Sequence, residues 1–218
     1  MDQLRKRFDQ LTWPEARNAA TRPGATVIWP FGACEQHGPH LPLSTDAVFA
    51  ESILDSVLVG LDPALPLWRL PCQALGFSPE HKNFSRTLSL SAPLILELVD
   101  QVGMLLAAMG MQRLVLFNAH GGQIGLLQVA ARQLRARCPS LAVLPCFLWS
   151  GVEGLAALLP EEELLHGLHA GQAETSLMLQ LEPDLVGSAR PDDGLVSSGS
   201  SQEPPEGWSL EGAAPCAW

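Results

Sequence analysis

The sequence has few cysteines, and none of them are closely paired. The five cysteines lie at positions 34, 72, 138, 146 and 216, which is an odd number without any CxxC spacing. This pattern argues against a disulfide framework and against a cysteine-based zinc knuckle. It favours a reducing compartment, and we therefore expect a cytoplasmic protein.

Basic residues are also scarce. The chain has 13 Lys and Arg against 23 Asp and Glu, a net charge of −10. Nucleic acids and anionic membranes both favour Lys/Arg patches, so we expect neither as a partner. The opening "MDQLRKRFDQ" has no apolar core of a secretory signal. No uninterrupted apolar run reaches the roughly 18 residues of a membrane span.

Sequence patterns of several large enzyme classes are missing as well. There is no GxSxG nucleophile motif, and neither a glycine-rich phosphate loop nor a dinucleotide fingerprint follows the expected strands. What remains is an ordinary globular composition, 47% hydrophobic and 17% charged over 218 residues. This is enough for one sizeable core, and we expect one domain.

Strand-like and helix-like segments alternate along the chain. Strands are predicted at 25–29, 65–71, 113–117 and 141–147, and helices at 46–59, 124–137 and 170–181, with another from an N-cap at Ser91 to a stop at Gly110. The alternation predicts an α/β fold with a mostly parallel sheet and helices on both faces. Functional sites in such folds lie beyond the carboxyl ends of the strands.

The stretch "WPFGACEQHGPHLPLSTD" follows the first predicted strand. Glu35 and His37 are two residues apart in an extended segment, which directs both side chains the same way. Asp46 opens the next helix. A purely structural interpretation stays open, because Asp46 could cap that helix while His37 and His40 serve as polar loop residues.

A second motif, "NAHGGQ", places His120 directly after the strand at 113–117. The fold rule brings it towards Glu35, His37 and Asp46. Two histidines and two carboxylates suit Zn²⁺, Mn²⁺ or Fe²⁺. If Asp46 bridges, two ions a few ångströms apart can bind.

Two further motifs carry polar groups. "LHAGQAETS" offers His169 as a general acid or base and Glu174 as a carboxylate for metal or for proton transfer. Either could instead have a structural role, with Glu174 as a buried cap and His169 facing solvent. "GFSPEHKNF" supplies candidate substrate-binding residues, which are Ser78, Glu80 and His81.

Cys34 is a rival candidate, as a thiol nucleophile. It has no lysine nearby in sequence and no recognisable cysteine-nucleophile motif. A small buried residue beside the site is the alternative role.

The four motifs "GACEQHGPHLPLSTD", "SPEH", "NAHGG" and "HAGQAETS", in this order and spacing, resemble the creatininase (creatinine amidohydrolase) family over about residues 9–190. The resemblance implies a single-domain, three-layer α/β/α fold that hydrolyses amide-type C–N bonds at a metal site, often a dinuclear one. By position, Glu35, His37, Asp46 and His120 match metal ligands, with Asp46 bridging. His169 matches the catalytic histidine. The resemblance also implies a homo-oligomer, with a hexamer as the expected form.

The chain departs from true creatininases at two positions inside the motifs. Gly122 stands where the family carries a metal-binding Glu, and no Trp precedes "HAG". The "HGG" form resembles instead the branch with formamide deformylases and the mycofactocin peptidase. Creatinine is therefore not the expected substrate, and Glu174 is the nearby acid expected to replace the missing ligand.

The composition changes near residue 187. We expect a hydrolase domain over 1–186 and a Gly/Ser/Pro-rich segment over 187–218, an incomplete C-terminal part of the same domain. Trp208 and Trp218 are expected to pack on the domain or on a neighbouring subunit.

The expected function is metal-dependent hydrolysis of an amide C–N bond in a small molecule, either a cyclic amide or a formamide. The expected cofactor is two divalent ions of Zn, Mn or Fe, with His169 and Glu174 moving protons. The alternative is a non-catalytic metal-binding scaffold with an incomplete pocket.

Overall fold

A computed structural model of the chain describes residues 6–81, 84, 86–166 and 169–190. The segment 191–218, with Trp208 and Trp218, lies outside the described residues. The packing expected for those two side chains, and most of the predicted segment 187–218, therefore stay predictions.

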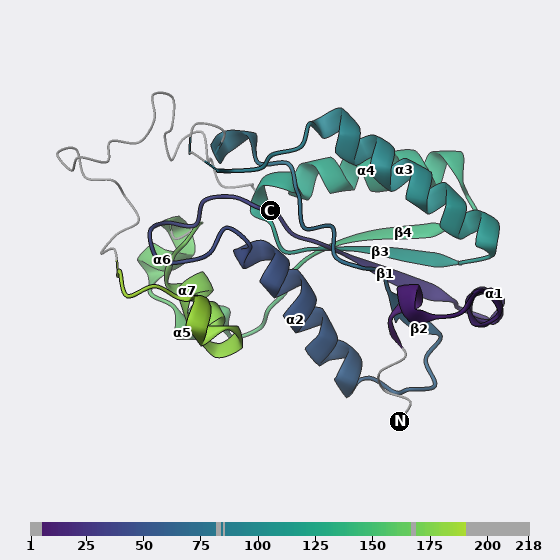
Figure 1. Cartoon of the computed structure of the whole chain (residues 1–218), viewed down its shortest axis with the longest axis horizontal. Helices are drawn as coiled ribbons and strands as arrows, with labels where there is room; N and C mark the ends of the chain where they lie inside the picture. Colours follow the sequence, from purple (N-terminus) through teal and green to yellow (C-terminus); the bar gives the residue numbers. More distant parts are fainter. Residues whose placement is uncertain (1–5, 82–83, 85, 167–168, 191–218) are drawn as a thin grey trace.

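The described residues form a parallel sheet between two helical layers (Figure 1). The strands follow the order β2-β1-β3-β4, and every neighbouring pair is parallel. Helix α2 covers one face, and helices α3 and α4 cover the other. The predicted three-layer α/β/α fold is confirmed. The bounds of these elements are β1 Thr26–Phe31, β2 Leu67–Arg69, β3 Arg113–Asn118, β4 Ala142–Phe147, α2 Thr45–Gly60, α3 Ala92–Met109 and α4 Ile124–Arg137.

Shorter elements complete the described chain. The helices are α1 Trp13–Ala20, α5 Leu155–Leu158, α6 Glu161–His166 and α7 Gln172–Leu181, and the 3₁₀ turns are η2 Phe8–Gln10, η3 Pro79–His81, η4 Gly121–Gln123 and η5 Pro183–Leu185. Helix α7 packs beside α2 through a cluster that includes Phe49 and Met178. This contact brings the "HAGQAETS" motif to the end of the sheet where α2 begins.

The core lies on both sides of β1, because helices cover both faces of this strand. Val27 and Phe31 point into the larger cluster under α3 and α4, while Ile28 packs against Leu54 and Leu58 of α2. All six residues of β1 are buried. A strand covered on both faces is predominantly apolar, which explains why this run has no polar alternation after Thr26.

Most predicted elements are found with small shifts of their ends. The first strand continues through Pro30 to Phe31. Proline cannot donate to a strand ladder, but β2 already ends at Arg69, so no bond of that ladder is lost at Pro30. Helix α3 ends as predicted, because Gly110 adopts a left-handed conformation with φ of 104°.

Helix α3 is the one described helix that is long and apolar enough to be a candidate membrane span. Core helices also pass this test of length and composition. In the described structure α3 lies against α4, where the close approach is made at Gly103 and Leu134. The composition of α3 alone therefore does not decide between a membrane span and a core helix.

The direction in which the chain adds strands to the sheet reverses between β1 and β3. The chain passes from β1 to β2 on one side, and then returns to β3 and β4 on the other. The helices that follow β1 and β3 accordingly lie on opposite faces of the sheet. In open α/β sheets, ligands bind outside the carboxyl ends of strands at such a switch point.

A prediction concerns Gly32, where the chain leaves β1 against the first turn of α2. A Cβ at this position would lie 2.5 Å from the Cα and 2.6 Å from the backbone nitrogen of Ala47. Backbone atoms cannot move aside as a side-chain tip can, so Gly32→Ala should destabilise the protein by about 1–3 kcal/mol. Chemical denaturation measures this.

The matched control is Gly125→Ala in α4, where an added Cβ would meet nothing within 4 Å. That change should be neutral or stabilising by up to about 1 kcal/mol, since alanine is the better helix former. Equal stability losses in the two variants would contradict the steric argument.

Candidate metal centre

Ligand-type side chains gather at the switch point between β1 and β3. Glu35 and His37 lie on the extended loop after β1, Asp46 lies in the first turn of α2, and His120 lies two residues beyond β3. Each of the four is at most 3% exposed. The structure thus brings together the four side chains that the order of strands predicted to converge. Their binding of metal stays a prediction.

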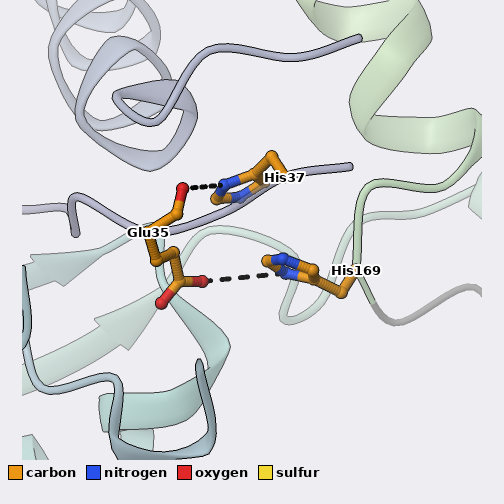
Figure 2. Close-up of side chains that lie close together, drawn as sticks. All are labelled: Glu35, His37 and His169. Atoms are coloured by element: carbon orange, nitrogen blue, oxygen red, sulfur yellow. Dashed lines mark hydrogen bonds and ion pairs between the residues drawn. The ribbon is translucent and has the colours of Figure 1, made fainter. Parts of the chain in front are cut away.

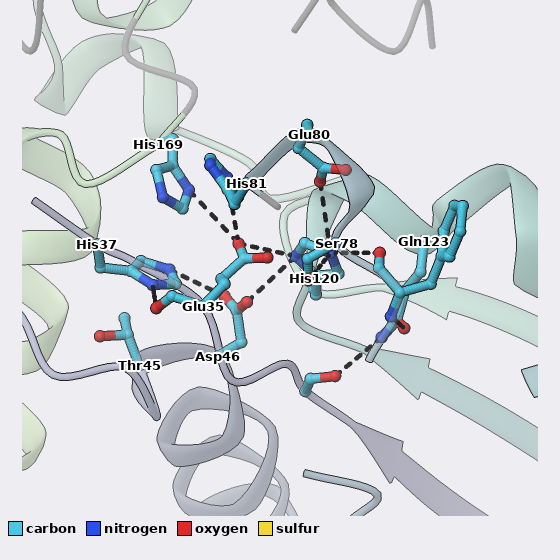
Figure 3. A network of polar contacts seen from close by, with 12 residues as sticks. Glu35, His37, Thr45, Asp46, Ser78, Glu80, His81, His120, Gln123 and His169 are labelled. Carbon is cyan, nitrogen blue, oxygen red and sulfur yellow. Dashed lines mark hydrogen bonds and ion pairs between the residues drawn. The ribbon is translucent and has the colours of Figure 1, made fainter. Parts of the chain in front are cut away.

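His120 faces two carboxylates with one ring nitrogen (Figure 3). Its Nδ1 lies 3.2 Å from Glu35 Oε1 and 3.2 Å from Asp46 Oδ2. Its Nε2 lies 3.0 Å from the carbonyl oxygen of Phe77. Because a carbonyl oxygen only accepts, Nε2 carries the proton and donates it, which leaves Nδ1 directed at the carboxylates.

The two oxygens of Asp46 face different histidines. Oδ2 faces His120, and Oδ1 lies 3.4 Å from Nε2 of His37. The other nitrogen of His37, Nδ1, lies 3.1 Å from the backbone carbonyl of Glu35 and is held by it. Asp46 therefore stands between two imidazoles, as a carboxylate that bridges two ions would.

The charges of this cluster shift its pKa values strongly. Burial alone would lower the pKa of His37, but the Asp46 carboxylate outweighs it and raises that pKa to about 9. Burial of His120 is likewise outweighed by Glu35 and Asp46, which raise its pKa. Burial would raise the pKa of Asp46, but His37 holds it below its usual range. Buried carboxylates here require positive charge nearby, which either protonated histidines or a cation can supply.

Glu174 approaches the same centre from α7. Its carboxylate belongs to one group with His37 and Asp46, with one ligand atom of each within 4.8 Å of the others. Glu174 Oε2 accepts a hydrogen bond of 2.5 Å from the backbone N–H of Ala170. Burial raises the pKa of Glu174 to about 7.

His169 lies beside Glu35 and His37 (Figure 2). Its Nδ1 is 3.7 Å from Glu35 Oε1, and its Nε2 is 2.5 Å from the carbonyl oxygen of Gln36. The ring centroid lies 4.3 Å from those of His37 and His81. Burial, together with the positive charge of His37, lowers the pKa of His169. A neutral ring with a proton on Nε2 leaves Nδ1 as an acceptor.

The three predicted substrate-binding residues lie within this cluster. Ser78 Oγ is 3.3 Å from His120 Nε2, and Glu80 Oε1 is 3.7 Å from the same nitrogen. His81 Nε2 lies 3.7 Å from Glu35 Oε1. Their position next to the candidate ligands is observed, whereas contact with a substrate stays a prediction.

Two residues of "NAHGGQ" that were given no role hold the loops together. Gln123 Nε2 donates to the carbonyl of Gly32 at 3.1 Å and to Asn118 Oδ1 at 2.9 Å, and Gln123 Oε1 accepts from the N–H of Phe77 at 3.2 Å. Asn118 in turn bonds both the N–H and the carbonyl of His120. Their place in the same hexapeptide as His120 was the available sequence signal.

The structure gives little support to Cys34 as a nucleophile. Its side chain is half-buried, and burial and the charge of Glu35 raise the pKa of its thiol. A raised pKa reduces the thiolate, which is the reactive form.

The cluster is suited to a divalent cation because several of its buried polar atoms lack hydrogen-bond partners. Glu35 Oε2, His37 Nε2 and Asp46 Oδ2 are buried and have no hydrogen-bond partner. Buried polar atoms normally have partners, and a cation coordinated by these atoms would supply one for each. Imidazole nitrogens with carboxylate oxygens are a donor set for zinc, manganese or iron. Among the described residues, three overlapping groups have this character: Glu35–His37–His169, Glu35–Glu80–His120 and His37–Asp46–Glu174.

The chain matches one family model, described as creatininase, creatinine amidohydrolase, over residues 9–215. It is 35% identical to the mycofactocin precursor peptide peptidase of Mycobacterium ulcerans (strain Agy99) over 180 residues, which cover 80% of this chain and 61% of the relative. It is 30% identical to the creatinine amidohydrolase of Pseudomonas putida over 191 residues, which cover 81% of this chain and 72% of the relative. The chain thus spans about three fifths of the length of the mycofactocin relatives.

Solved structures agree with these matches. A structure described as "Creatininase Mn" superimposes with a TM-score of 0.68 at 27% identity, covering 82% of this chain and 74% of the other. A creatininase variant of the Zn–Zn type also gives a TM-score of 0.68 at 27% identity, covering 82% and 73%.

Proposed function

Because the chain belongs to the creatininase family, we propose that it is a metal-dependent amidohydrolase that cleaves an amide C–N bond. The observation that carries the proposal is the placement of Asp46. Its two oxygens face His37 and His120, and Asp46 Oδ2, Glu35 Oε2 and His37 Nε2 are buried without hydrogen-bond partners. Such an arrangement is costly for folding unless a ligand completes it.

The chain's own residues would hold two ions. Glu35 and His120 serve one, His37 and Glu174 serve the other, and Asp46 serves both. Bound divalent cations supply Lewis acidity, which polarises a substrate carbonyl and lowers the pKa of water. Zinc, manganese and iron are the candidates, and relatives of both a manganese and a zinc type exist among the creatininases.

His169 is the proposed general acid and base. Its Nε2 proton is engaged by the Gln36 carbonyl, so Nδ1 is the atom that accepts a proton and returns it to the leaving nitrogen. The lowered pKa of His169 keeps Nδ1 unprotonated at neutral pH before the reaction. If Glu174 is not a ligand, its carboxyl group, with a pKa near 7, is the second candidate for proton transfer.

Two substrate classes are proposed, in order. Four similar relatives are named mycofactocin precursor peptide peptidase, at 32–35% identity, which supports a peptide amide bond as the first candidate. A small cyclic amide or formamide, the class expected from the motifs, is the second. Creatinine itself should be a poor substrate, since Gly122 offers no side chain to a metal.

We also propose the assembly and location expected from the sequence, which are a homo-oligomer, with a hexamer as the first candidate, and the cytoplasm. Light scattering on the purified protein measures the oligomer, and fractionation of the source cells measures the location. No nucleic acid or membrane partner is proposed.

Chelation tests the proposed function. The metal-free protein should lose turnover on the active members of a panel of short peptides, formamides, lactams and creatinine, and added Mn²⁺ or Zn²⁺ should restore it. Alkylation of the thiols should leave turnover intact.

Each of the other outcomes would indicate a different function for the chain. Bound metal without turnover on any substrate indicates the non-catalytic scaffold. Turnover that survives chelation but not alkylation indicates a thiol enzyme that uses Cys34. Efficient turnover of creatinine would contradict the role given to Gly122.

A further inference from the structure

Glu80 reaches the candidate metal centre from a loop separate from those that carry the other ligands. It lies in η3, between β2 and α3, and its side chain is 25% exposed. Its Oε1 is 3.7 Å from His120 Nε2. One ligand atom each of Glu35, Glu80 and His120 lies within 4.8 Å of the others, which makes Glu80 the third member of a metal-type group (Figure 3).

The position of the Glu80 carboxylate depends on Gly122. A Cβ built on Gly122 would lie 2.0 Å from Glu80 Oε1 and 2.7 Å from His120 Nε2. The first distance is far inside any van der Waals contact, so a side chain at position 122 and this placement of the Glu80 carboxylate exclude each other. The neighbouring Gly121 differs, because a Cβ there would meet nothing within 4 Å.

The electrostatics of the group call for a cation. Glu35 is 1% exposed, and its Oε2 has no hydrogen-bond partner. Drawing a further carboxylate towards Glu35 and Asp46 adds like charge to a buried place, which is unfavourable unless positive charge lies between the acids. A divalent ion held by all three carboxylates and His120 removes both the repulsion and the unpaired oxygen.

We propose that Glu80 is a ligand of the ion held by Glu35 and His120, and that Gly122 is without a side chain because the Glu80 carboxylate occupies that space. The inference rests on the metal centre of the proposed function. It assigns Glu80 as the acid that completes the ligand set of this ion. Glu174 remains, with His37, a proposed ligand of the other ion.

The first test measures metal in the Glu80→Gln variant, which keeps the shape of the side chain and removes its charge. Calorimetric titration of the metal-free protein with Mn²⁺ and with Zn²⁺ should show two ions in the unmodified protein. The variant should bind one of them at least about tenfold more weakly, since loss of even an outer partner of a metal ligand costs 10–100-fold. With Co²⁺ as the probe, the visible absorption of the bound ion should also change.

The control for this test is Glu153→Gln, which removes the same charge at an exposed loop position. It should bind both ions as the unmodified protein does. An unchanged melting temperature of the metal-free Glu80→Gln protein shows that the fold is kept. Glu80→Asp, which retains the charge but withdraws the carboxylate, should weaken the same ion.

The second test compares Gly122→Ala with Gly121→Ala. The methyl group at position 122 should displace the Glu80 carboxylate and weaken the same ion by a similar factor, whereas the methyl group at position 121 should change nothing.

The outcomes separate this inference from the function on which it rests. Two ions bound with unchanged affinity and an unchanged Co²⁺ spectrum in Glu80→Gln overturn the ligand role alone. A rise in KM in that variant without metal loss would show that Glu80 binds substrate instead. If the unmodified protein binds no metal, both the inference and the proposed function are wrong.

Discussion

Replacing Asp46 with alanine is expected to remove most of the divalent metal from the protein, whereas replacing His37 with alanine should remove only one of the two ions. The two oxygens of Asp46 face different histidines, at 3.2 and 3.4 Å, so its loss weakens both ions at once. His37 belongs to the group with Asp46 and Glu174 and serves one ion. Turnover of Asp46→Ala should fall by more than the roughly 10–100-fold that is lost when a hydrogen-bond partner of a metal ligand is removed.

Elemental analysis of the two variants and of Asp46→Asn, which preserves the side-chain shape, measures this. Asp184→Ala is the control, because Asp184 is an exposed acid in η5. Full metal occupancy in Asp46→Ala would refute the bridging role. Equal losses in the Asp46 and His37 variants would mean that one ion, not two, binds here.

Replacing His169 with glutamine is expected to lower kcat by about 10²–10⁴-fold while the metal content stays unchanged. Its Nδ1 is the unprotonated nitrogen beside Glu35, and its Nε2 is engaged with the backbone of Gln36. Glutamine can keep a hydrogen bond to that carbonyl, but it cannot accept and return a proton.

The informative comparison is between metal and rate in the same preparation. His169 also belongs to a metal-type group with Glu35 and His37. If His169→Gln loses an ion together with its activity, His169 is a ligand and the general acid and base must be sought elsewhere. A variant with full metal and an unaltered rate would leave His169 without a chemical role.

The parts of the fold that the sequence predicted are those whose residues carry their own signals. Residues 27–31 of β1 and 114–117 of β3 are unbroken apolar runs, and α3 lies between Ser91 and a left-handed Gly110. Helix α1 was not predicted because it is only eight residues long and buries little, although its Thr12–Glu15 capping box was an available sequence signal. Only Ala19 and Ala20 are buried in it, while Trp13 is 76% exposed.

The convergence of the site residues was predictable from the topology of the sheet. Glu35 and His120 follow adjacent parallel strands, so the topology alone brings them together. The place of Glu80 was not predictable in this way. It depends on the path of a loop between β2 and α3, and on the space left by a glycine 42 positions further along the chain (80 to 122).

The single amide of Gln123 joins the loop after β1 at Gly32, the loop after β2 at Phe77 and the end of β3 at Asn118. Three segments bonded to one fully buried side chain form a cooperative unit, since opening any one of them breaks a hydrogen bond of Gln123 and loosens the side chain that holds the other two. Amide hydrogens in these segments should therefore exchange with solvent at a common rate. The loops beside the candidate metal centre would then assemble and come apart in one step, and not one after another.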